Sequence, residues 1–193
     1  VGYYDVRWRI DAPEGYLPRT EVTSLVVMRP ASPRTDRAAI AVDGALSWAY
    51  RDTARLRRAV AIASRLGVSC IRDRFAWSHV SPERDSADYS RYELSASLQS
   101  DAGLDVYSIF QRTPPWASSA PTGTARRFAV GYPPADPMEA FRAARDAASR
   151  LRAHVRYWEI WNEPNLPGYF VGRPDEYAAL LKAAYLGVKA GDP

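Results

Sequence analysis

The residues best suited to chemistry form one short stretch, Trp161-Asn162-Glu163-Pro164, directly after an apolar run. Glu163 stands where a strand would give way to a loop, and Pro164 removes a backbone donor and fixes the direction of the exit. Trp161 beside it can exclude water, which favours the protonated form of a carboxyl group. A carboxyl group in that form can act as a general acid. The alternative is that Glu163 is an ordinary loop carboxylate at the surface.

The elements that must position this stretch form a βα repeat. From about residue 38 the sequence alternates short apolar runs with amphipathic segments of helical period. The expected strands are 38–48, 68–72, 104–110 and 155–161, and helices are expected at 52–66, at 91–102, from 137 and from 174. Asp52 is a suitable N-cap, and Gly67 and Gly103 stand where glycines end helices. Such repeats form a parallel sheet with right-handed crossovers.

The same periodicity predicts which helical side chains face the core. Each expected helix carries one apolar stripe. Among the residues predicted to face inward are Leu66, Leu94, Met138, Leu181 and Tyr185.

Two layouts suit a βα repeat, an open doubly wound sheet and a barrel. The open sheet is disfavoured because GALSWAYRD, after the first run, is not a glycine-rich phosphate loop. The loops after the second and third strands are long and aromatic, and they fall at the carboxyl ends, where barrel sites lie. The chain has 193 residues, whereas a whole barrel needs about 250. We therefore predict an α/β fold, a partial (β/α)₈ TIM barrel made of its first four βα units.

A different pattern precedes the barrel units. Apolar and polar residues alternate over 4–10, which predicts a half-buried strand. APEGYLP predicts a turn, and EVTSLVVM a second strand that Pro30 and Pro33 end. The predicted domains are a β-hairpin segment at 1–34 and the barrel segment at 35–193. The hairpin is interpreted either as an extension that packs on the barrel or as the last strands of a β-sandwich.

Composition excludes several classes of protein. The chain is 47% hydrophobic with a net charge of +4, which is unlike a disordered chain. No apolar run reaches about 18 residues, so no membrane span is expected. Cys70 has no cysteine partner, and His79 and His154 cannot form a ligand cluster, so no metal or cofactor is expected. Basic residues are interspersed with acids, which does not favour a nucleic-acid partner.

Three motifs in the expected order carry a resemblance to a known family. They are Trp-Asn-Glu-Pro at the end of the fourth strand, IRDRFAWSHVSPE at the second and GLDVYSIFQRTPPWA at the third. The stretch 38–193 resembles retaining glycoside hydrolases of clan A, the (β/α)₈ enzymes that include β-xylosidases and cellulases. The resemblance implies hydrolysis of O-glycosidic bonds in a glycoside, oligosaccharide or polysaccharide.

The resemblance also implies roles for individual residues. Glu163 would be the general acid and base, Asn162 would bind the sugar 2-hydroxyl, and Arg72 would orient a nucleophilic carboxylate. Gln111 stands where relatives often carry histidine, which leaves a sugar contact open. Aromatic rings at strand ends suit a sugar cleft. The expected substrate-binding residues are Asn162, Arg72, Trp77, Gln111, Trp116 and Trp161, and Trp48 joins them as an aromatic of the rim. The alternatives are a structural ion pair for Arg72 and a core position for Trp77.

Strand parity predicts further contacts around the fourth strand. Glu159 and Glu163 share parity, so Glu159 is expected to face the barrel interior and to pair with Arg72 or Arg74. Trp158 has the opposite parity and is expected between strand and helix. Tyr169 and Phe170 are expected either to line a leaving-group subsite or to pack on the helix that follows.

The mechanism of such enzymes needs a second carboxylate about 5 Å from the first. In clan A this nucleophile is a glutamate at the end of the seventh strand, and no other glutamate here has a matching context. We therefore expect the 193 residues to be the acid/base half of a longer protein and to be inactive alone.

Two other functions remain open. One is a non-catalytic carbohydrate-binding protein on a barrel scaffold. The other is a barrel enzyme with different chemistry, which Lys182 and Lys189 support weakly because both fall in the last helix. The sequence does not indicate the sugar, the cell location or the oligomeric state.

Overall fold

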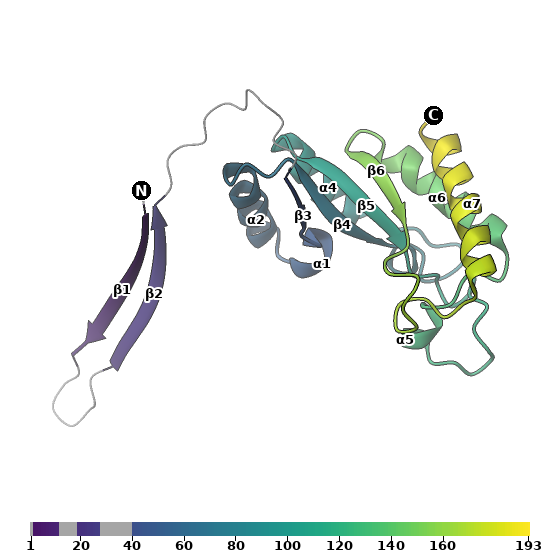
Figure 1. Cartoon of the computed structure of the whole chain (residues 1–193), viewed down its shortest axis with the longest axis horizontal. Helices are drawn as coiled ribbons and strands as arrows, with labels where there is room; N and C mark the ends of the chain where they lie inside the picture. Colours follow the sequence, from purple (N-terminus) through teal and green to yellow (C-terminus); the bar gives the residue numbers. More distant parts are fainter. Residues whose placement is uncertain (1, 12–18, 28–39) are drawn as a thin grey trace. The chain divides into compact units, whose positions relative to one another are not determined.

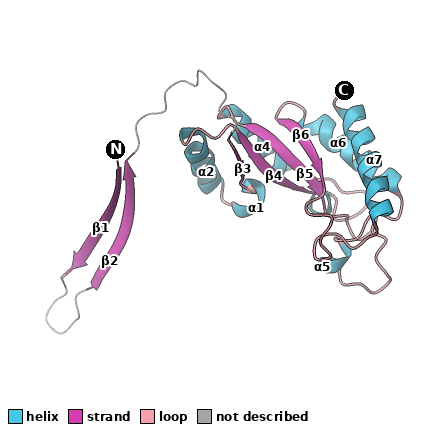
Figure 2. Ribbon diagram, viewed as in Figure 1, coloured by secondary structure: helices cyan, strands magenta, loops and turns pink. Residues whose placement is uncertain are grey.

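The computed structural model describes residues 2–11, 19–27 and 40–193. The chain divides into two compact units, 1–35 and 36–193, which are considered separately. Figure 1 shows the course of the chain, and Figure 2 its helices and strands. In the described ranges, no helix is long and apolar enough to cross a membrane.

The first unit is a β-hairpin, as the sequence predicts. Strand β1 (Gly2–Ile10) pairs antiparallel with β2 (Arg19–Val27), so that Gly2 lies opposite Val27 and Ile10 opposite Arg19. In the hairpin taken by itself, Trp8 is 58% exposed. A two-stranded ribbon has no second layer on which to bury a face. The expected turn within 12–18 and the two prolines Pro30 and Pro33 lie outside the described residues.

The second unit is a parallel four-stranded sheet in the order β3-β4-β5-β6, with helices between successive strands (Figures 1 and 2). The strands are β3 (Ala41–Asp43), β4 (Cys70–Ala76), β5 (Asp105–Gln111) and β6 (Val155–Ile160). The helices are α1 (Leu46–Ala49), α2 (Thr53–Arg65), α3 (Trp77–Val80), α4 (Ser90–Asp101), α5 (Arg126–Ala129), α6 (Pro137–Leu151) and α7 (Pro174–Gly191). The sequential strand order confirms the prediction of a partial barrel.

Local signals account for the long helices. The Asp52 side chain accepts a hydrogen bond of 2.8 Å from the Arg55 amide at the start of α2. Gly67 and Gly103 have φ of 83° and 76° and end α2 and α4, as predicted. The one-turn helices α1, α3 and α5 are not predicted by the sequence. Helix α1 also shortens the first expected strand, so that β3 holds only three residues.

The two faces of the sheet differ in character. Side chains on the outer face are buried against the helices, namely Ile71, Phe75, Val106 and Phe110. The inner face carries Arg72, Arg74, Tyr107, Tyr157 and Glu159, which are polar or only partly covered. In a closed barrel this inner face is the interior, so the sheet presents its polar residues where a barrel keeps its site.

The predicted helical stripes are only partly right. Leu66, Leu94, Met138, Leu181 and Tyr185 are all exposed rather than buried. Helix α4 instead buries Tyr92, Ser95, Ala96 and Gln99. Leu181 and Tyr185 lie beside the edge of β6, whose only partner among the described strands is β5. The apolar periodicity identifies the helices, but it does not show which apolar face of a helix packs against another element.

Helices α6 and α7 pack side by side at a point where α7 carries glycine (Figure 1). A Cβ added at Gly187 would lie 2.3 Å from the carbonyl oxygen of Phe141, and one at Gly191 would lie 2.1 Å from that of Arg145. Because both obstacles are backbone atoms, they cannot turn away. The close approach of the two helices therefore requires these glycines.

We predict that Gly187→Ala destabilises the second unit. Alanine favours an isolated helix, but here its methyl group forces the helices apart, and overpacking of this kind costs about 1–3 kcal/mol. Urea unfolding measures the loss. Gly168→Ala is the control, because a Cβ there meets nothing within 4 Å. Equal stability of the two variants would contradict the packing described here.

Candidate functional site

A cleft of about 900 Å³ lies at the carboxyl ends of the four strands. Each strand contributes to it: Asp43 from β3, Arg72 and Arg74 from β4, Gln111 from β5, and Asn162 and Glu163 from the turn after β6. Loops complete the wall with residues from 127–132 and 167–171. The carboxyl ends of barrel strands are where the catalytic residues of TIM-barrel enzymes lie.

Arg72 is the centre of this cleft. Its Nε and Nη2 donate to the two carboxylate oxygens of Glu159 at 2.8 and 2.6 Å, a bidentate pair. Its Nη1 donates to Asp43 at 2.7 Å. The hydrogen bond with Glu159 is the main reason that the pKa of Arg72 is raised. The predicted pairing of Glu159 with Arg72 is confirmed, and it joins strand β4 to strand β6.

A third contact of Arg72 sets the orientation of Asn162. Nη2 of Arg72 also donates to Oδ1 of Asn162 at 2.9 Å. Because a guanidinium can only donate, the amide oxygen of Asn162 must face it. The amide nitrogen then faces the other way and donates to Oε2 of Glu163 at 3.2 Å. A continuous series of contacts thus runs from Glu159 through Arg72 and Asn162 to Glu163.

Asp43 is a carboxylate of the cleft that the sequence interpretation missed. It accepts from Arg74 at 2.5 and 2.9 Å and from Arg72 at 2.7 Å. The hydrogen bond from Arg74 is the largest of the effects that lower the pKa of Asp43, and burial opposes it. Asp43 therefore stays ionised and shares the charge of both arginines.

The backbone around the cleft is unusual. The described non-glycine residues with positive φ are Ala45, Arg112, Trp161 and Glu163, at 44°, 67°, 68° and 48°. All four lie within three residues of the end of β3, β5 or β6. Such conformations cost of order 1–3 kcal/mol each and are concentrated at functional sites. Their concentration at one edge of the sheet is independent support for a site there.

The aromatic residues predicted to line the cleft mostly do not. Trp77 is 3% exposed and stacks on Phe110, so its core alternative is correct. Trp161 is 2% exposed, because its left-handed backbone turns the ring into the core against Phe170. Trp116 donates from Nε1 to the Ser81 carbonyl and is not among the residues of the cleft. We report these three as corrections to the predicted substrate contacts.

Of the predicted aromatic rim, Trp48 lines the cleft. It belongs to α1, which a buried carboxylate holds in place. Asp73, on the outer face of β4, accepts hydrogen bonds from the amide and hydroxyl of Ser47. Arg91 donates to the carbonyl oxygens of Ser47 and Trp48. These contacts hold the backbone of α1 in place and so fix the position of Trp48. Ser95 also donates to Asp73. Residues 47, 48, 73, 91 and 95 lie in separate stretches of the sequence, so this cluster could not be predicted from it.

The remaining predicted residues divide between the cleft and the core. Asn162, Arg72, Gln111 and Glu163 all line the cleft together. Glu163 is exposed within it, so the expected shielding by Trp161 is absent here. Tyr169 lines the cleft, whereas Phe170 packs against Tyr177 of α7. Asp43, Arg112 and Arg127 were not predicted as residues of the cleft. In the sequence, their charge is the only property that could have marked them as candidates.

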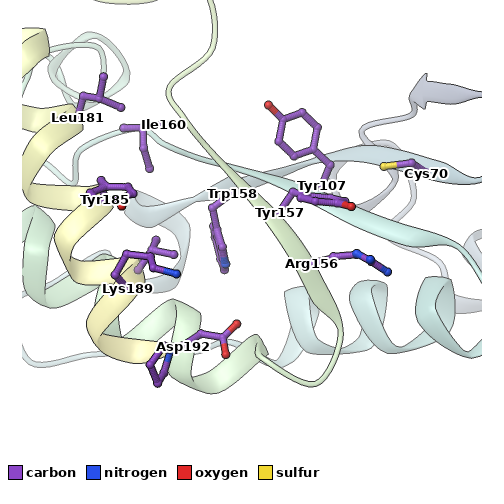
Figure 3. Close-up of a pocket in the computed structure, with 12 residues that line it drawn as sticks. Cys70, Tyr107, Arg156, Tyr157, Trp158, Ile160, Leu181, Tyr185, Lys189 and Asp192 are labelled. Carbon is purple, nitrogen blue, oxygen red and sulfur yellow. The ribbon is translucent and has the colours of Figure 1, made fainter. Parts of the chain in front are cut away.

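A second hollow of about 680 Å³ lies along the edge strand β6. Figure 3 shows Trp158 with the α7 side chains Tyr185 and Lys189 on one side of the β6 ribbon and Tyr107 on the other. Trp158 also meets Phe75 edge-on at 5.7 Å, as its parity predicts. The hollow follows a strand edge and contains none of the predicted catalytic residues. In the described ranges, no group of His, Cys, Asp and Glu is arranged to hold a metal ion.

Comparison with known proteins gives structural neighbours only. No protein-family model matches the sequence, and no curated protein matches it. A family 39 glycoside hydrolase from Bacteroides cellulosilyticus superposes with a TM-score of 0.70 at 23% identity, over 100% of this chain and 37% of that one. A monomeric β-xylosidase from Caulobacter crescentus gives 0.59 at 19% identity, over 86% and 36%.

A third neighbour was solved with a sugar bound. It is a GH5_18 protein from Bifidobacterium longum in complex with Manβ1-4GlcNAc, with a TM-score of 0.58 at 16% identity, over 78% of this chain and 40% of that one. The chain thus spans well under half the length of these neighbours. The neighbours are clan A TIM-barrel glycoside hydrolases. The chain has the fold of part of such a barrel.

We predict that Asp43 makes the stability of the protein depend on pH. Its folded-state pKa lies below the ordinary value of 3.8, so its ion pairs stabilise the fold above about pH 4 and are lost as the pH falls through the folded pKa. Asp43→Asn should therefore be less stable than the wild type at neutral pH, and the difference should shrink below about pH 4. Urea unfolding across this range measures it, and a difference that is constant with pH would contradict the assignment.

Proposed function

We propose that the chain forms the acid/base part of a retaining glycoside hydrolase, with Glu163 as general acid and base. The observation that carries the proposal is the series Glu159, Arg72, Asn162 and Glu163 at the carboxyl edge of a partial barrel. It holds one carboxyl group at a fixed place in a cleft large enough for sugar rings. The resemblance of Trp-Asn-Glu-Pro to clan A and the fold of the neighbours support the same assignment.

In the proposed reaction, Glu163 gives its proton to the glycosidic oxygen as the bond to the anomeric carbon breaks. Asn162, held by Arg72, donates from Nδ2 to the sugar 2-hydroxyl, a contact that strengthens in the transition state. A nucleophilic carboxylate takes the glycosyl group, and Glu163 then removes a proton from the water that releases it. Protein groups suffice for these steps, and the reaction needs no cofactor.

The nucleophile must lie about 5–5.5 Å from the acid/base in a retaining enzyme. Among the described residues, two other carboxylates close to Arg72, those of Asp43 and Glu159, are each bound to arginine. We propose that the nucleophile comes from a barrel strand beyond these four and that Arg72 helps to orient it. A carbohydrate-binding protein without catalysis would use the same cleft but would have no such carboxylate.

We predict a specific defect in the protein that carries this sequence when Glu163→Gln is introduced. General acid catalysis contributes about 10²–10⁴-fold, so hydrolysis of a glycoside with a poor leaving group should fall by that factor. Formation of the glycosyl-enzyme from a dinitrophenyl glycoside needs no proton donor and should be much less affected. Added azide, which needs no general base, should restore turnover by giving a glycosyl azide of retained configuration. Steady-state kinetics and product analysis measure all three.

The matched control is Glu93→Gln on α4, where the carboxylate pairs with Arg150 outside the cleft. It should leave hydrolysis unchanged. Equal losses with good and poor leaving groups, or an active Glu163→Gln protein, would contradict the role of Glu163. Sugar binding without any hydrolysis by the unaltered protein would support the non-catalytic alternative.

We also predict that the 193 residues alone release no nitrophenol from aryl glycosides, because the second carboxylate is not supplied. The measurement is absorbance over a long incubation with the purified chain. Release that Glu163→Gln abolishes would show that a carboxylate of this chain is the nucleophile and would overturn the proposal on this point.

A further inference from the structure

Four arginines line the cleft, and they fall into two pairs. Arg72 and Arg74 are neutralised, because Asp43 and Glu159 bind them at 2.5 to 2.7 Å. Arg112 and Arg127 have no carboxylate partner in the part of the chain that the structure describes, and their guanidinium groups there lie over aromatic rings. The cleft therefore contains two cations, Arg112 and Arg127, that form no ion pair with its described carboxylates.

Arg112 is placed with some backbone strain. It follows β5 with φ of 67°, and its carbonyl oxygen accepts a hydrogen bond from Ser78 at 2.9 Å. Its guanidinium lies over the ring of Trp48, 5.4 Å from the centroid. A guanidinium beside an aromatic ring keeps N–H groups that match a carboxylate or sulfate. Its charge also reaches His79, whose pKa is lowered by burial and then by Arg112.

Arg127 approaches the same cleft from the long loop after β5. It belongs to α5 and lies over Phe128, which is 58% exposed, at 4.7 Å. The adjacent Arg126 pairs with Glu83, whereas Arg127 lines the cleft. The turn after α5 is tied to the loop after β6, because Val171 donates to the carbonyl of Gly131 at 2.8 Å. Arg127 is thus held near the loop that bears Glu163.

We infer that Arg112 and Arg127 form a subsite for an acidic sugar, one with a carboxylate or a sulfate group. The inference rests on the proposed function and specifies its substrate class. A neutral sugar offers hydroxyl groups, which ordinary polar side chains satisfy, and gives no use for two unpaired cations. An anionic group can accept two parallel hydrogen bonds from a guanidinium. The rings of Trp48 and Phe128 hold the two guanidinium groups beside the cleft.

Arginines also bind the phosphate groups of a nucleic acid, which is the alternative ligand for this cleft. The cleft disfavours it, because Asp43 and Glu163 lie among the same lining residues and repel a continuous phosphate chain. A single acidic sugar can place its charge at the arginines and its neutral atoms at the carboxylates. The geometry therefore favours a saccharide with isolated charges.

The test compares matched ligands on the 193-residue chain by isothermal titration calorimetry at low ionic strength. The ligands are 4-nitrophenyl hexosides of gluco, galacto and manno configuration, each as the neutral sugar, the uronide and the 6-sulfate. In at least one configuration an acidic form should bind about tenfold more tightly than the neutral one. Added salt should reduce this preference, and the uronide and sulfate arms show which group the site takes.

Variants show which residues cause the preference for acidic over neutral glycosides. In Arg112→Gln/Arg127→Gln the ratio of acidic to neutral affinity should fall to near one, and in the single Arg127→Gln variant to an intermediate value. Arg58→Gln, an exposed residue of α2 with the same loss of charge, is the control and should keep the full ratio. Circular dichroism confirms that the variants fold.

Three results would overturn the inference. If neutral and acidic glycosides bind equally well, the acidic subsite is wrong while the proposed function stands. If no glycoside binds, the proposed function fails and the subsite with it. If a single-stranded DNA oligonucleotide displaces the uronide and loses this ability in the double variant, the two arginines belong to a nucleic-acid site.

Discussion

The charge of Arg72 is the constraint on which the rest of the cleft depends. A guanidinium remains protonated at all physiological pH values, and in a partly buried position it needs anionic partners. Glu159 supplies two oxygens, Asp43 supplies one, and the amide oxygen of Asn162 supplies another. Because these partners lie on β3 and on or just after β6, Arg72 on β4 links three segments that are distant in the sequence. The orientation of Asn162 and the position of Glu163 follow from it.

The backbone that carries Asn162 and Glu163 is conformationally strained. Trp161 and Glu163 both adopt left-handed conformations, so the chain leaves β6 by a sharp turn instead of continuing the strand. Trp161 then packs into the core, where Nε1 donates to the carbonyl of Tyr169 at 3.0 Å. The buried ring anchors the turn, while Glu163 is left exposed in the cleft. Strain next to a firmly packed anchor is a common way to hold a reactive side chain in place.

Much of the fold could be predicted because its signals are local. Asp52 caps a helix and Gly67 ends it within one turn of chain, and the apolar runs mark the strands. The pairing of Glu159 with Arg72 was accessible through strand parity. Trp77 and Trp161 were misplaced because an aromatic residue at a strand end suits both a core and a sugar platform. Arg112 and Arg127 were missed because their importance lies in what they lack, a carboxylate partner, and only three-dimensional contacts show that.

The most direct test of the proposed site is to locate a bound sugar on the chain. In a ¹⁵N-labelled sample, the side-chain amide of Asn162 and the Nε–H of Arg72 give separate resonances that can be followed during titration with aryl glycosides. Both signals should shift with a saturable dependence on ligand, and they should still shift in Glu163→Gln, because this change removes the proton donor and leaves the contact between Arg72 and Asn162 in place. Shifts confined to the hollow along β6, at residues such as Tyr157 and Lys189, with Asn162 and Arg72 unmoved, would contradict the proposed site.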